Sequence, residues 1–179
     1  MSETNDYARS FPPSASRDAR VLVLGSMPGR RSLAAQEYYA HPRNAFWPIM
    51  EELFGIPRDD PYARRLSLLR QQKVALWDVL QSCERPGSLD TEIVEASIVP
   101  NDFPTFLKQH PRIHTIFFNG GKAEQAFRKY VRPLRSSTHL ELPTHRLPST
   151  SPAHAARTFE EKVEHWRVVA EAVSEPHRL

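Results

Sequence analysis

Cysteine is almost absent from this chain of 179 residues, in which Cys83 is the only one. A single thiol excludes an internal disulfide, and it cannot supply the ligands of an iron–sulfur cluster or of a cysteine-based zinc site. We expect no cofactor and no metal site. The low thiol content agrees with a reducing cytoplasm.

Long apolar runs and a strong charge of one sign are also missing. No run approaches the roughly 20 apolar residues of a membrane-spanning helix, and the polar N-terminus has no signal-peptide core. The 24 Lys and Arg residues and the 21 Asp and Glu residues leave a formal net charge of +3. Such mild basicity permits nucleic-acid binding but does not demonstrate it. We expect a soluble, cytoplasmic protein.

Short apolar runs alternate with segments of helical periodicity along the chain. The hydrophobic fraction of 40% and the charged fraction of 25% are typical of a globular protein. Strands are predicted at 20–25, 73–80, 114–118 and 140–142, and helices at 46–54, 60–72, 102–110, 122–131 and 158–173. This alternation predicts an α/β fold with a central, mostly parallel, four-stranded sheet. We expect a loose tail at 1–19, a surface loop at 83–93 and a single domain over 20–179.

The stretch from Arg20 to Met50 organises the rest of the chain. Its apolar run Val21–Leu24 ends at Gly25, and a tight turn precedes a polar and aromatic loop at 36–44. In an open α/β sheet, ligands bind in the crevice outside the carboxyl ends of the strands. A loop at this place that carries aromatic rings, an amide and a histidine predicts a site for a flat, polar ligand.

Three segments of the chain carry a family resemblance. They are LGSMPGRRSL followed by QEYYAHPRNAFW within 24–47, FFNGGK at 117–122, and LPSTSPAH at 147–154. In this order they resemble the motifs of the uracil-DNA glycosylase superfamily, in particular those of its hypoxanthine-DNA (deoxyinosine) glycosylase branch, family 6. The resemblance spans roughly residues 20–156 and is far more specific than a single glycine-rich turn.

The resemblance implies a three-layer α/β/α fold and a monofunctional DNA glycosylase of base excision repair. Such an enzyme flips a deaminated base, hypoxanthine and also uracil or xanthine, out of the DNA, and water then hydrolyses the N-glycosidic bond. Its partner is double- or single-stranded DNA that contains deaminated bases, and we expect a monomer without an iron–sulfur cluster. Two alternatives stay open: a uracil or thymine mismatch glycosylase, and a non-catalytic DNA- or nucleotide-binding module of the same fold.

Asn44 is the leading candidate for a catalytic residue. The resemblance assigns that role to the Asn of HPxNxFW, which is Asn44 here. Ser26 stands where the wider superfamily often has Asp or Asn, directly after the glycine of the first strand, and is the second catalytic candidate. The amide oxygen of Asn44 can orient a water and its NH₂ group can donate a hydrogen bond. A structural alternative is that Asn44 caps the helix that begins at Ala45.

The other candidates divide into two groups. The base-binding candidates are Gly25, Met27, Pro28, Tyr39, His41, Phe46 and Asn119. The DNA-binding candidates are Gly29, Gly120, Gly121, Lys122, Ser149, Thr150, Ser151, Pro152, Ala153 and His154. The Asn119 amide offers a donor and an acceptor to the N1–H/O6 edge of hypoxanthine, and Tyr39 or Phe46 can stack on a base. Structural alternatives are a turn residue at Asn119 and core packing at Phe46.

Overall fold

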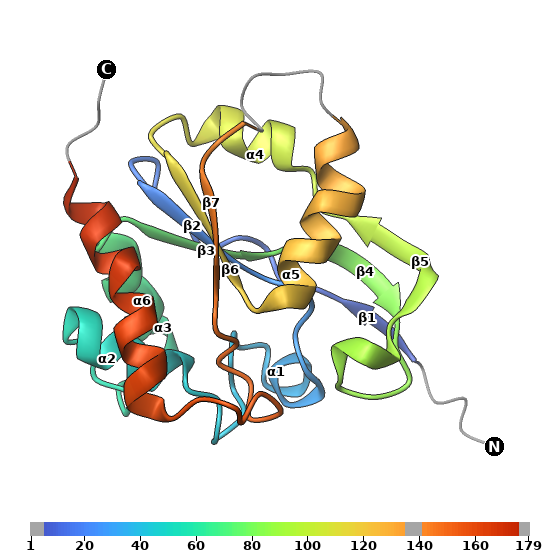
Figure 1. Ribbon diagram of the computed structural model, residues 1–179, viewed down its shortest axis with the longest axis horizontal. Coiled ribbons are helices and arrows are strands. Elements are labelled where there is room, and N and C mark those ends of the chain that lie inside the picture. Colours follow the sequence, from blue (N-terminus) through green and yellow to red (C-terminus); the bar gives the residue numbers. More distant parts are fainter. Residues whose placement is uncertain (1–5, 135–140, 176–179) are drawn as a thin grey trace.

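A parallel sheet forms the centre of the computed structural model, which describes residues 6–134 and 141–175 (Figure 1). Its four strands lie in the order β3 (Val74–Asp78), β2 (Val21–Gly25), β6 (Thr115–Asn119) and β7 (Thr144–Leu147). Every neighbouring pair in this sheet is parallel, so the four carboxyl ends lie at one edge. Register places Gly25 opposite Asp78 at that edge.

The apolar run of β2 forms a central strand because both of its faces are covered. All five of its residues are buried. Val21 and Val23 pack in one hydrophobic cluster, whereas Leu22 and Leu24 pack in another. Successive side chains of a strand point to opposite faces, so this run supplies two cores at once.

Helices cover both faces of the sheet, which confirms the three-layer α/β/α prediction. One face packs against α2 (Phe46–Phe54), α3 (Tyr62–Gln71) and α6 (Phe159–Ser174). The other packs against α4 (Phe103–Gln109), α5 (Gly121–Ala126) and the π-helical turn η2 (Phe127–Val131), after which comes the short 3-10 turn η3 (Arg132–Leu134). Figure 1 shows these two groups on opposite sides of the strands, with α1 (Arg30–Ala35) below the edge where β2 ends.

Local signals place the helix ends where the sequence predicts them. The Asp102 side chain accepts a hydrogen bond from the N–H of Thr105 at the start of α4. At the start of α6, Thr158 and Glu161 form a capping box. Such caps satisfy N–H groups that the helix itself leaves without a partner. The predicted helices at 46–54, 60–72, 102–110, 122–131 and 158–173 are therefore confirmed within a few residues.

A second sheet corrects two predictions. It is antiparallel and contains β1 (Tyr7–Arg9), β4 (Leu80–Glu84) and β5 (Val94–Pro100) in that order. The prediction of a loose tail at 1–19 is wrong for residues 6–19, because β1 pairs with β4 and Ser14 forms a β-bridge with Leu76. Residues 1–5 lie outside the described part of the chain. The surface loop at 83–93 is confirmed only in part, because Cys83 and Glu84 belong to β4 and Cys83 is buried, whereas the rest of the segment is a mostly exposed loop that contains the 3-10 turn η1 (Asp90–Glu92).

The fourth strand of the main sheet lies further along the chain than expected. The prediction of 140–142 is wrong, since β7 spans Thr144–Leu147 and Leu140 lies outside the described residues. The carbonyl of Pro143 accepts a hydrogen bond from Ile116, and the strand pairing follows this proline. Only Leu147 in β7 is buried. A polar edge strand of this kind lacks the apolar alternation that a sequence search detects.

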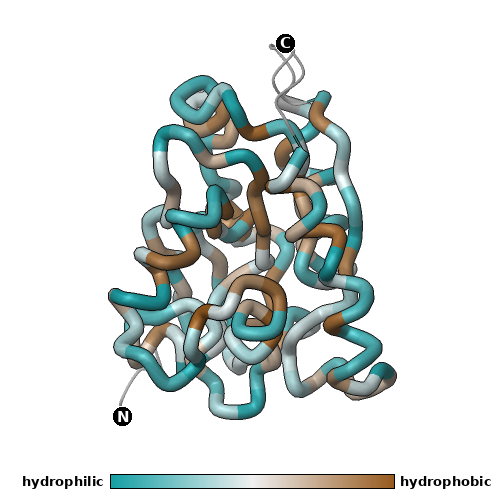
Figure 2. Tube along the Cα trace, turned by 90° about the vertical axis from the view of Figure 1, so that its left-hand side faces the viewer, coloured by the Kyte–Doolittle hydropathy of each residue, from teal (hydrophilic) through white to brown (hydrophobic). Residues whose placement is uncertain are grey.

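The hydropathy of the residues matches this layered arrangement. In Figure 2 the outermost loops are mostly hydrophilic, while hydrophobic stretches run through the interior. Among the described residues, no helix has both the length and the apolar character required to cross a membrane.

We expect Ala8→Asp to unfold the protein more easily, because Ala8 is buried in β1 and an unpaired carboxylate there is costly. The predicted loss is at least about 2 kcal/mol in the free energy of unfolding, measured by urea denaturation. The control Arg9→Asp changes the exposed neighbour in the same strand and should stay within about 0.5 kcal/mol. Equal, small effects of both variants would mean that β1 contributes nothing to stability.

Candidate active site

A cavity of about 550 Å³ opens at the carboxyl edge of the parallel sheet. It is lined by parts of the segments 25–32, 38–44, 88–91, 119–122 and 149–154, together with Asp78. The predicted site residues that line it are Gly25, Ser26, Met27, Pro28, Gly29, Tyr39, His41, Asn44, Asn119, Gly120, Gly121, Lys122, Ser149, Thr150, Ser151, Pro152, Ala153 and His154. Segments that are distant in sequence thus meet at one cavity, as the position rule for α/β sheets predicts.

Thr150 joins three of these segments. The Asn119 Nδ2 donates to the Thr150 hydroxyl and the Thr150 N–H donates to Asn119 Oδ1, both at 2.9 Å. The carbonyl of Thr150 accepts from the N–H of Ala45, also at 2.9 Å. Thr150 is only 1% exposed. Because both polar atoms of the Asn119 carboxamide bond Thr150, this amide fixes the 149–154 loop against the end of β6.

Asn44 lies at the start of α2, next to this junction. Its Oδ1 accepts from the N–H of Phe46 at 2.9 Å, and its own N–H donates to the carbonyl of His41. Helix α2 begins at Phe46 with Ala45 as its N-cap residue, so Asn44 lies one position before the cap and not at the cap itself, although its side chain bonds the first N–H of the helix. The same bond orients a carboxamide that also lines the cavity, so this contact at the helix start is compatible with a role in the site.

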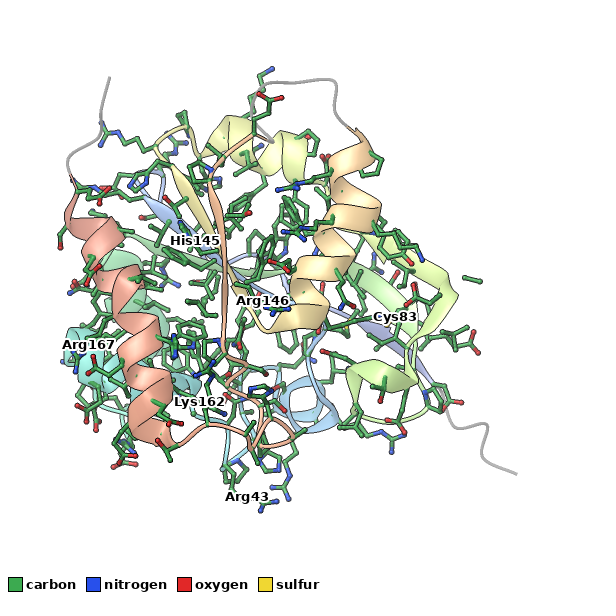
Figure 3. All side chains as sticks on the ribbon, viewed as in Figure 1. Arg43, Cys83, His145, Arg146, Lys162 and Arg167 are labelled. Carbon is green, nitrogen blue, oxygen red and sulfur yellow. The ribbon has the colours of Figure 1, made fainter. Side chains whose placement is uncertain are left out.

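Helix α6 holds the 149–154 loop from the outside. The Trp166 indole donates to the carbonyl of Pro148, and the Lys162 ammonium donates to the carbonyl of His154 at 2.8 Å. Lys162 is only 6% exposed, and its burial lowers its pKa; Figure 3 shows it at the lower part of α6. The loop is thus anchored at both of its ends.

Phe46 is not part of the cavity wall, which corrects its prediction as a base-binding residue. It is fully buried and stacks against Tyr39 with ring centroids 4.2 Å apart. An aromatic residue at the start of an amphipathic helix packs into the core when the helix covers the sheet, and Phe46 does so in α2. The Phe46 ring therefore packs against the ring of Tyr39, which lines the cavity, and does not line the cavity itself.

Asp78 and Tyr39 form the inner wall of the cavity. A Cβ on Gly25 would stand 2.6 Å from Asp78 Oδ1 and 3.2 Å from the Tyr39 hydroxyl, so only glycine leaves room for these groups. Asp78 Oδ2 and the Tyr39 hydroxyl are buried and make no hydrogen bond of normal geometry with the described residues. Burial and the charge of Asp90 raise the pKa of Asp78 to about 7. Burial, then the charge of Asp78, raises the pKa of Tyr39, and the nearby Asn119 side chain acts in the opposite direction.

Asp90 is the second carboxyl group of the cavity. Its Oδ2 accepts from the Ser26 hydroxyl at 2.7 Å. Burial raises the pKa of Asp90, and the bond from Ser26 acts in the opposite direction. The sequence prediction missed both acids. Asp78 could have been found as a polar residue at the carboxyl end of a predicted strand, whereas Asp90 lies in a segment whose loop pattern carries no such signal.

Two further cavity residues have defined partners. The Lys122 ammonium donates to Glu95 at 2.8 Å. His41 Nδ1 accepts the N–H of Arg43, which requires an unprotonated nitrogen, and burial followed by Arg31 and Arg43 lowers the pKa of His41. Among the described residues, no group of three or more His, Cys, Asp or Glu side chains could hold a metal ion.

A comparison with known protein families identifies the family of this chain. The model of the family described as the uracil DNA glycosylase superfamily matches residues 12–173. This chain belongs to that superfamily. The family resemblance seen in the sequence motifs is thereby confirmed, and the match includes every segment that lines the cavity.

Two relatives and one solved structure are similar to this chain over most of its length. A protein named hypoxanthine DNA glycosylase from Methanosarcina acetivorans is 33% identical over 90% of this chain and 96% of its own length. One of the same name from Methanosarcina barkeri is 34% identical over 64% of this chain and 72% of its own. The solution NMR structure of an M. acetivorans protein described as a candidate uracil DNA glycosylase gives a TM-score of 0.77 at 29% identity, covering 94% of this chain and 99% of that one.

The buried carboxyl of Asp78 makes stability depend on pH. Its pKa is about 7 in the folded protein and 3.8 in its ordinary state, so folding opposes its ionisation and the contribution of Asp78 to stability falls as pH rises from 4 to 7. We expect Asp78→Asn to remove this loss. Thermal unfolding should show little gain near pH 4 and a gain that grows to a plateau above pH 7.

The exposed Asp59→Asn is the matched control for this variant and should stay within about 0.5 kcal/mol of the parent at each pH. A difference between Asp78→Asn and the parent that is constant across this pH range would contradict a carboxyl group that changes charge near neutrality.

Proposed function

We propose that this chain is a monofunctional DNA glycosylase that removes deaminated bases, with hypoxanthine as the main substrate and uracil and xanthine as further ones. It acts as a monomer on double- or single-stranded DNA by flipping the base into the cavity, where water hydrolyses the N-glycosidic bond. The names of the two Methanosarcina relatives support hypoxanthine as the first substrate.

The observation that carries this proposal is the pair of polar groups on the inner wall. Asp78 supplies an acceptor and Tyr39 a donor, both beside Gly25, and Asp78 Oδ2 and the Tyr39 hydroxyl are buried without a hydrogen-bond partner of normal geometry among the described residues. An unsatisfied buried polar group costs about 1–3 kcal/mol, so a ligand that pairs with both groups is favoured. Hypoxanthine offers N1–H to Asp78 and O6 to Tyr39, which satisfies them together.

The same pair disfavours the bases from which deaminated bases arise. Adenine presents an N1 lone pair where hypoxanthine has N1–H, and an amino group where it has O6. Cytosine differs from uracil in the same way. The glycosidic bond fixes the orientation of a flipped base, so adenine cannot exchange the two positions. Guanine shares the O6/N1–H edge and differs by its 2-amino group, so its exclusion requires the shape of the cavity.

The other site residues have roles around this base edge. We propose that Asn44 orients the attacking water and that Asn119 positions Thr150 and the 149–154 loop. Hydroxyl and N–H groups of that loop, with the exposed Arg30 and Arg31 at the cavity, then contact DNA phosphates. The ammonium of Lys122 is paired with Glu95, which argues against a Schiff base with the sugar and for hydrolysis alone.

Excision on defined duplexes tests the activity. Labelled strands that contain inosine, uracil, xanthine or thymine opposite guanine are incubated with the protein and then cleaved with alkali. We expect the fastest excision from inosine. Asn44→Ala should lower the single-turnover rate by about 100-fold without loss of DNA affinity, because it removes the group that orients the water.

Gln125→Ala, which removes an exposed amide on α5, is the matched control for Asn44→Ala and should keep the parental rate. DNA binding without excision of any base would favour the non-catalytic alternative, and fastest excision of uracil or mismatched thymine would favour the mismatch enzyme.

Base preference tests the inner wall. Duplexes with 2′-fluorinated sugars resist cleavage, and their affinity can be compared for hypoxanthine and for unsubstituted purine, which lacks both O6 and N1–H. We expect the parent to prefer hypoxanthine, and Asp78→Asn and Tyr39→Phe each to reduce that preference by about 10-fold through loss of one buried hydrogen bond. If both variants weaken the two duplexes equally, the residues support the fold and do not recognise the base edge.

A further inference from the structure

The cavity contains a proton acceptor that the sequence motifs do not supply. Ser26 stands at the turn after β2, and a serine hydroxyl is no base at neutral pH. The amide of Asn44 can orient a water but cannot take its proton. Among the described residues that line the cavity, the acids are Asp78 and Asp90. Asp78 lies at the inner wall beside Gly25, which leaves Asp90 as the acid next to Ser26.

The segment that carries Asp90 is tied to the turn after β2. The Arg85 guanidinium donates to the carbonyl of Pro28 at 2.6 Å. The N–H of Arg30 donates to the Ser88 hydroxyl at 3.1 Å, and the Arg30 side chain bonds the carbonyl of Pro86. Three contacts therefore hold the residues before η1 against the motif that contains Ser26. Asp90 is positioned by the fold although it lies far from that motif in sequence.

The carboxylate of Asp90 keeps capacity for a second partner. The Ser26 hydroxyl donates to Oδ2 at 2.7 Å, and a carboxylate has about four lone-pair sites on its two oxygens. Ser26 thus orients Asp90 and leaves acceptor positions for a water in the cavity. Burial raises the pKa of Asp90, which makes it a better proton acceptor than an exposed aspartate when it is ionised.

We propose that Asp90, oriented by Ser26, is the general base of the glycosylase and supplies the negative charge that faces the sugar in the transition state. This inference rests on the proposed function and adds the residue that activates the water. In this mechanism Asn44 orients the same water, and Ser26 positions the Asp90 carboxylate. Asp78 keeps its proposed role as the hydrogen-bond acceptor for the edge of the base. Asp78 on β3 thereby recognises the base, and Asp90 on η1 activates the water in the same cavity.

The step balances without any further reactant. The bond between C1′ of the sugar and N9 of hypoxanthine breaks, and its electron pair leaves with the base. The oxygen of the water forms a bond to C1′, and one of its protons passes to Asp90. Asp90 then releases this proton, and the departing base anion takes one from solvent. One water is consumed, and an abasic sugar and free hypoxanthine are formed.

Chemical rescue tests this role. We expect Asp90→Ala and Asp90→Asn to lower single-turnover excision of hypoxanthine by about 10²–10⁴-fold, with unchanged affinity for the uncleavable 2′-fluorinated duplex. Ser26→Ala should lower it by roughly 10-fold, because Asp90 loses its orienting partner. Added sodium formate supplies a carboxylate to the space vacated in Asp90→Ala and should restore the rate at least about 10-fold.

Asn44→Ala is the matched control for the rescue, because formate should not restore a variant that retains Asp90. Circular dichroism and DNA affinity show whether each variant is folded. Parental rates in both Asp90 variants, or a loss in Asp90→Ala that formate leaves unchanged, would overturn the role of Asp90. A parent protein without excision of any base would instead overturn the proposed function, which separates the two failures.

Discussion

The double hydrogen bond between Asn119 and Thr150 is the contact on which the rest of the site depends. It closes the 149–154 loop onto the end of β6, while the carbonyl of Thr150 holds the start of α2 through Ala45. Gly120 permits this closure, since its φ of +93° is a conformation that other residues rarely adopt and a Cβ there would lie 3.0 Å from Ser149. Without these hydrogen bonds, nothing in this junction would hold the 149–154 loop at a defined position relative to Asn44.

The two aspartates of the cavity show how function opposes stability. Asp78 is 3% exposed, and its Oδ2 has no hydrogen-bond partner among the described residues, an arrangement that a fold selected for stability alone would avoid. Burial raises the pKa of Asp78 and of Asp90, and each is placed by a different element: β3 in one case and η1 in the other. In the proposed mechanism, these separate environments let Asp78 recognise the base while Asp90 activates the water.

Much of the architecture could be predicted because its signals are local. The run Val21–Leu24 is apolar on both faces, α6 has a capping box at Thr158, and the motif segments lie at strand ends. The predictions that were wrong lack such signals. The edge strand β7 is polar, and the strand β1 is only three residues long and is held by its pairing with β4. The base-binding prediction for Phe46 is wrong because an aromatic residue in a motif does not reveal whether its ring points into the cavity or into the core.

The sequence by itself determined the α/β class through its hydrophobic periodicity, and the resemblance of its motifs to a known family pointed to the three layers and to the segments that form the cavity. The tertiary structure decided which polar atoms of those segments are already used in hydrogen bonds within the protein. It bonded Asn119 to Thr150, brought Asp78 beside Tyr39 and Asp90 beside Ser26, and buried Phe46. Hydrogen-bond partners and burial depend on residues tens of positions apart, and no local pattern in the chain records them.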